Sequence, residues 1–221
     1  MVDMGAVHAF TAEMHTGFLI LAFACIACTF LCQLKLRFIK GERSNRLLKA
    51  ARSYLEPTGF VAAIAGVFGL VLSAITGSLS WPAEMIQEDP LTGNKIILTS
   101  CALAIWCAAV FFRWKSTRDL WTFPSSSLLY TGMAAAAFGL TALAGSLGAH
   151  IVQGGSLLDP VLGALGLDLT QKIILDSSLA YIVIIASIAV IAGFVLAAWK
   201  TGISKRQMRV SKAGGWPSWK E

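Results

Sequence analysis

Three histidines, His8, His15 and His150, are the side chains of this sequence best suited to bind a cofactor. His8 and His15 are seven residues apart, so they share one face if the segment around them is helical. Imidazoles hold b-type haem, and imidazole beside carboxylate or thioether suits copper or zinc. The sequence therefore indicates a candidate haem b site at His15 and His150, with copper at all three histidines as the second choice. The residue types equally allow rings that cap helix ends or bind lipid headgroups and water.

The five cysteines form the second set of reactive side chains. Cys25, Cys28 and Cys32 follow one another at helical spacing along one stripe, whereas Cys101 and Cys107 fall on different faces of a later segment. All five lie within apolar runs, where a thiol behaves as an inert small hydrophobe. We expect these cysteines to pack, with metal binding or redox chemistry as the alternative.

Long apolar runs determine the fold class. Hydrophobic residues make up 56% of the 221-residue chain and charged residues only 14%, against about 25% charged residues in soluble domains. Five runs have about the 17 to 25 residues that an α-helix needs to cross a bilayer. They cover residues 16–36, 58–79, 96–112, 127–151 and 178–199. We therefore expect an all-α, polytopic membrane protein with five transmembrane helices, four in a bundle and one peripheral.

The distribution of basic residues assigns the two sides of the membrane. The N-terminal segment has no Lys or Arg. The end of the first span and the first connection together carry seven, the later connections carry one, three and one, and the C-terminal tail carries six. By the positive-inside rule, this alternation predicts an N-terminus outside and a C-terminus in the cytoplasm. The net charge of +6 is thus a topology signal, and no nucleic-acid partner is expected.

The predicted spans divide the chain into four parts. Residues 1–156 form the four-helix membrane bundle, and residues 157–177 form an outer connection whose apolar spacing predicts a short amphipathic helix. Residues 178–199 form the fifth transmembrane helix, and residues 200–221 form a basic cytoplasmic tail. Two tryptophans beside Gly and Pro in that tail favour docking to a partner protein.

Three stretches are similar to a known family: VHAFTAEMHTGFLIL at the first span, AITGSLSW ending the second and GSLGAHIVQGGS ending the fourth. In them the chain resembles a widespread prokaryotic four-helix membrane domain of unknown function, some members of which are fused to Rieske iron-sulfur domains. The resemblance covers residues 7–156, and the fifth span has no counterpart in it. Ala9 stands where the family has a proline, and Asn94 where a further histidine is expected. The resemblance implies a four-helix bundle, the plasma (inner) membrane of a prokaryote and a redox partner.

The function expected from the sequence is non-catalytic. Nucleophile-elbow, zinc-protease and phosphate-loop signatures are missing from it. No charged residue lies in the middle of a span, which disfavours a small-molecule transporter. We expect an integral subunit or partner of a respiratory-type membrane redox complex that takes part in electron transport, in contact with the lipid bilayer and with other subunits. The alternative is a cofactor-free accessory or scaffold subunit of a larger membrane enzyme complex.

Overall fold

The computed structural model describes residues 3–38, 42–82, 84, 88–116, 120–166, 168 and 185. The helices in this part of the chain are α1 (Met4–Phe38), α2 (Glu42–Ser80), α4 (Pro90–Ser116), α5 (Pro124–Gln153) and α6 (Asp159–Ala164). All but α6 are long and apolar enough to cross a membrane. The structure thus supports an all-α, multi-pass membrane protein, with four spans among the residues that it describes. The predicted fifth span, apart from residue 185, and the predicted tail lie outside the described residues.

The first two helices extend well beyond the apolar runs that predict them. α1 begins at Met4, so the segment that contains His8 and His15 is helical. α2 begins at Glu42 and includes the basic segment that precedes its apolar run. Pro57 lies inside α2, where the helix continues although proline has no N–H for one of its backbone hydrogen bonds. The basic segment is therefore helical and continuous with the second span.

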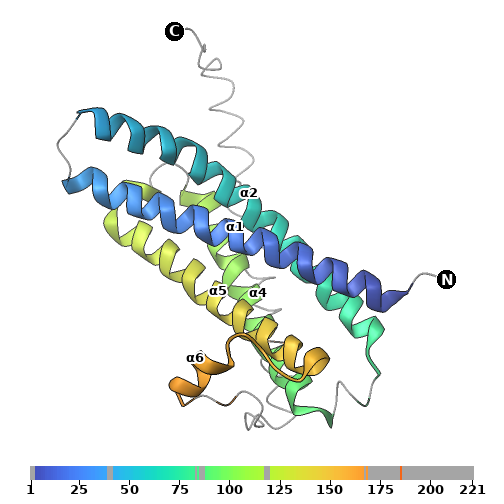
Figure 1. The fold of residues 1–221 in the computed structure, drawn as a ribbon. Helices are drawn as coiled ribbons and strands as arrows, with labels where there is room; N and C mark the ends of the chain where they lie inside the picture. The colour runs from blue at the N-terminus through green and yellow to red at the C-terminus, as the bar shows by residue number, and fades with distance from the viewer. Residues whose placement is uncertain are drawn as a thin grey trace, which may run out of the picture.

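The four long helices form an antiparallel bundle (Figure 1). α1 packs along α2, α4 packs along α5, and smaller contacts of α1 with α5 and of α2 with α4 join the two pairs. The bundle has two ends, which we name by their residues. The histidine end, where α1 and α4 begin, holds His8, Trp81, Lys95 and His150, and the arginine end holds Arg52, Arg113 and Trp121. The short α6, orange in Figure 1, lies near the histidine end of α5.

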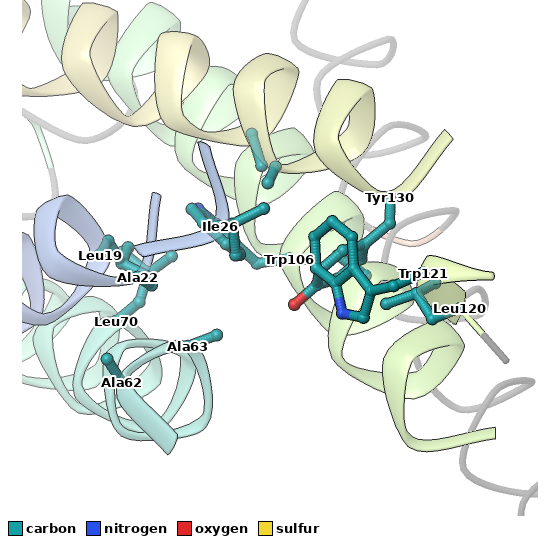
Figure 2. Close-up of a cluster of buried hydrophobic side chains, with 13 residues drawn as sticks. Leu19, Ala22, Ile26, Ala62, Ala63, Leu70, Trp106, Leu120, Trp121 and Tyr130 are labelled. Carbon is teal, nitrogen blue, oxygen red and sulfur yellow. The ribbon is translucent and has the colours of Figure 1, made fainter. Parts of the chain in front are cut away.

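The core lies between the long helices and includes the fully buried indole of Trp106 on α4. Leucines and alanines of α1 and α2 lie on one side of this cluster, and Trp121 and Tyr130 lie on the other (Figure 2). Phe23 of α1 stacks on Phe138 of α5 with ring centroids 4.6 Å apart. This stacked pair joins the two helical hairpins through an interaction that aromatic rings favour.

Glycines on α2 determine how closely α1 approaches. A Cβ atom on Gly59 would lie 2.9 Å from Cβ of Cys25, and one on Gly69 would lie 2.9 Å from Cβ of His15. Real Cβ atoms do not approach so closely, so a glycine is required at both positions. Close backbone packing through small residues drives the association of membrane helices, because burial from lipid supplies no hydrophobic gain. Gly139 of α5, by contrast, faces open space.

Candidate functional site at the histidine end

His8 lies between α1 and the last turns of α2. Its Nδ1 is 3.0 Å from the carbonyl oxygen of Ser73, and because a carbonyl only accepts, Nδ1 donates the proton of this hydrogen bond. The ring also makes an edge contact with Trp81, with centroids 5.7 Å apart. A Cβ atom on Gly77 would lie 2.9 Å from Cε1 of His8, so the glycine makes room for the ring. His8 thus packs the start of α1 against the end of α2.

His15 is the most deeply placed of the three histidines, with only 8% of its surface exposed. Its Nδ1 donates to the carbonyl oxygen of Thr11, one turn earlier, at 2.9 Å. This bond fixes the ring and leaves the lone pair on Nε2. The backbone of His15 packs directly on Gly69, and its side chain experiences the charges of His8 and Lys95. His15 is therefore an oriented, buried imidazole where α1 packs on α2, further along α1 than His8.

His150 lies in the last turn of α5 and joins this helix to Asp159, the first residue of α6. Its Nε2 lies 2.8 Å from Oδ1 of Asp159, while Oδ2 of Asp159 accepts the backbone N–H of Ser156 at 2.9 Å. Gly154, with a φ of 75°, turns the chain in the left-handed region and donates its N–H to the carbonyl of His150. The N–H of Ser156 and the imidazole of His150 hold the pKa of the Asp159 carboxyl below its ordinary value. His150 therefore fastens the connection after α5 to the bundle.

Replacing Asp159 with asparagine is expected to loosen the segment from Gly154 to Leu162, because the carboxylate that joins Ser156 and His150 loses its charge. The folded pKa of Asp159 lies below its unfolded value. The stability that its carboxylate gives to the folded segment is therefore fully present above about pH 4 and is lost as the pH falls through the folded pKa. Amide hydrogen exchange at neutral pH should be faster in this segment of the variant. Asp3→Asn, at the start of α1, is the control, and equal protection in wild type and Asp159→Asn would contradict the assignment.

Lys95 belongs to this end but is not among the site residues that the sequence predicts, where it counts only toward the topology. Its Nζ lies 4.6 Å from the ring centroid of Trp81 and packs on Gly148, where a Cβ atom would be 3.0 Å away. The charge of Lys95 also acts on His8 and His15. The only signal in the sequence was a lone lysine directly before an apolar run. Lys95 of α4 thus brings a positive charge into contact with Trp81 after α2 and with Gly148 of α5, and this charge also acts on the two histidines of α1.

The structure places the predicted ligands in two groups. His8 and His15 lie on one face of α1 against α2, as their spacing predicts. His150 is bound to Asp159, and within the described ranges no hydrogen bond joins it to either of the other histidines. The described residues contain no group of three or more His, Cys, Asp or Glu side chains arranged for a metal ion. The cysteines are free thiols, and Cys25 is buried at the contact with Gly59.

The arginine end contains a second polar cluster that the sequence did not predict. Arg113 of α4 forms an ion pair with Glu56 of α2, and both side chains are mostly buried. Arg52 donates to the side-chain oxygen of Gln33 at 2.6 Å, and Gln33 donates to the carbonyl oxygen of Trp121 at 2.9 Å. These bonds connect α1, α2, α4 and the segment before α5. We assign this cluster a structural role.

Comparison of the chain with protein families, with curated proteins and with solved structures finds no match. The resemblance to the prokaryotic four-helix domain therefore stays a prediction, and a functional proposal has to come from the residues of the histidine end.

Proposed function

We propose that this chain is a non-catalytic integral subunit or partner of a redox complex in the plasma (inner) membrane of a prokaryote, with a b-type haem bound through His15. The orientation of His15 carries the proposal. Its Nδ1 donates to the carbonyl of Thr11, so Nε2 presents a lone pair. Histidines that bind metals are commonly held in this way, with one ring nitrogen hydrogen-bonded and the other on the metal. Bound haem would supply one-electron chemistry.

The three histidines fit the role of ligand unequally. His15 fits because its free nitrogen is Nε2 and its ring is fixed. His150, the second ligand in the proposal, has Nε2 engaged by Asp159 and offers Nδ1. His8 has Nδ1 engaged by Ser73 and offers Nε2. In each case the chain's own contribution is to orient an imidazole, and at His15 burial also excludes water from it.

The proposal is tested by the visible difference spectrum, dithionite-reduced minus oxidised, of the purified full chain, with metal analysis on the same sample. A sharp b-type α band that His15→Ala abolishes is the expected result. Thr16→Ala is the matched control, because Thr16 is the exposed neighbour of His15 and its hydroxyl bonds only within its own helix. A flat spectrum from protein that also contains no metal contradicts the redox proposal.

A second candidate function is a cofactor-free accessory subunit of a larger membrane complex. The packing of α1 on α2 favours it, because the spaces at Gly69 and Gly77 are filled by His15 and His8 themselves. Glycines that admit a flat macrocycle would instead face an open space. Here the three imidazoles would act as packing and hydrogen-bonding groups. Protein without a spectrum, whose co-purification with partner subunits is lost in His8→Ala or His150→Ala, would support this function.

A further inference from the structure

Lys95 projects from the second turn of α4 into the histidine end of the bundle. Its ammonium lies over the indole of Trp81, which follows α2, and against the backbone of Gly148 on α5. The absence of a side chain at Gly148 makes room for it, since a Cβ atom there would be 3.0 Å from Nζ. His8 and His15 of α1 complete the electrostatic surroundings. Lys95 therefore contacts the segment after α2 and the backbone of α5, and its charge acts on the two histidines of α1.

The positive charge of Lys95 has no carboxylate partner among the residues that the structure describes. Its ammonium carries three donors, and no hydrogen bond to a described residue engages them. Asp89, at the start of α4, is occupied by Thr92, whose backbone N–H and hydroxyl both donate to it. Glu84 and Glu88 are exposed. A half-buried cation with two imidazoles nearby and no counter-charge among the described residues is costly in a membrane protein, and an anion would offset that cost.

We propose that Lys95 binds the phosphate group of an anionic lipid headgroup at the histidine end of the bundle. Lysine binds phosphate as a compact point charge with freely rotating donors. Lys95 directly precedes the apolar run at 96–112, so it lies at the level where lipid phosphates meet the hydrocarbon region. Trp81, its stacking partner, is a residue type enriched at this interface. The site does not depend on a haem or metal at His15.

Lipid-dependent thermal unfolding of the purified full chain in a non-ionic detergent tests this site. Phosphatidylglycerol should raise the unfolding midpoint of the wild type by several degrees more than an equal amount of phosphatidylcholine does. Lys95→Met should abolish that difference. Lys115→Met is the matched control, because Lys115 is an exposed lysine at the other end of the same helix and should keep the preference. An equal preference for phosphatidylglycerol in wild type and Lys95→Met overturns the proposal.

One further variant and one further probe separate binding of the lipid from misfolding and from binding of free phosphate. Lys95→Arg retains the charge and should retain the preference for phosphatidylglycerol, which guards against a Lys95→Met variant that is merely misfolded. Inorganic phosphate is the second probe, added without lipid. Stabilisation by inorganic phosphate that equals that of the lipid and is lost in Lys95→Met would overturn the lipid as the source of the phosphate group. No response to inorganic phosphate, together with a full response to phosphatidylglycerol, supports the lipid site.

Discussion

Gly69→Val is expected to destabilise the packing of α1 on α2 by about 1–3 kcal/mol, the usual cost of forcing extra atoms into a packed site. The new Cβ would lie 2.9 Å from Cβ of His15 and 3.3 Å from its Cα. Neither atom moves by rotation of a side chain, so α1 itself would have to shift. Because His15 is the residue displaced, the variant should also weaken the binding of any ligand that His15 holds. Unfolding free energies in detergent, from denaturant titration, measure the effect.

Gly139→Val is the matched control for this substitution. It makes the same chemical change on α5, but a Cβ atom at Gly139 meets nothing within 4 Å. A surface substitution of this kind usually changes stability by no more than about 0.5 kcal/mol. If both valine variants lose the same stability, the loss comes from helix propensity and not from the contact of Gly69 with His15.

The four described spans were predictable because each contains an apolar run long enough to cross a bilayer. The lengths of the helices were not, because polar residues extend them where a neighbouring helix provides partners. α1 continues back to Met4 alongside the end of α2, where the hydroxyl of Ser80 donates to the carbonyl of Met4 at 2.9 Å. His8 bonds to the same part of α2 through Ser73. Such contacts depend on which helix lies next to α1, and the hydropathy of the sequence does not predict helix neighbours.

The candidate site was predictable only where it depends on one helix. The spacing of His8 and His15 placed both on one face of α1, which is where the structure has them. The partner of His150 depends on the left-handed turn at Gly154, which brings Asp159 back to the end of α5. The surroundings of Lys95 depend on residues far away in the chain, and a run of hydropathy values cannot place them beside it.

Removal of the carboxylate of Glu56 is expected to be the most destabilising single change at the arginine end. Glu56→Gln leaves the guanidinium of Arg113 without this counter-charge, although the two side chains retain only 19% and 16% exposure. Breaking a buried ion pair by removing one partner costs about 3–5 kcal/mol, and the residual exposure places this pair at the lower end of that range. Denaturant titration in detergent measures the loss, and Glu84→Gln, at an exposed position, is the control.

Replacing both charges should restore most of that stability. Desolvating two charges offsets much of their attraction, so an apolar pair of similar volume is often as stable as a buried ion pair. In Glu56→Leu combined with Arg113→Met, the methionine can keep the contact that Arg113 makes with the ring of Phe60, at 5.4 Å from its centroid. A double variant near wild-type stability would show that the cost of Glu56→Gln comes from removing one charge of the pair while the other stays in place. A double variant as unstable as Glu56→Gln would instead show that the attraction between the two charges stabilises the packing of α2 on α4.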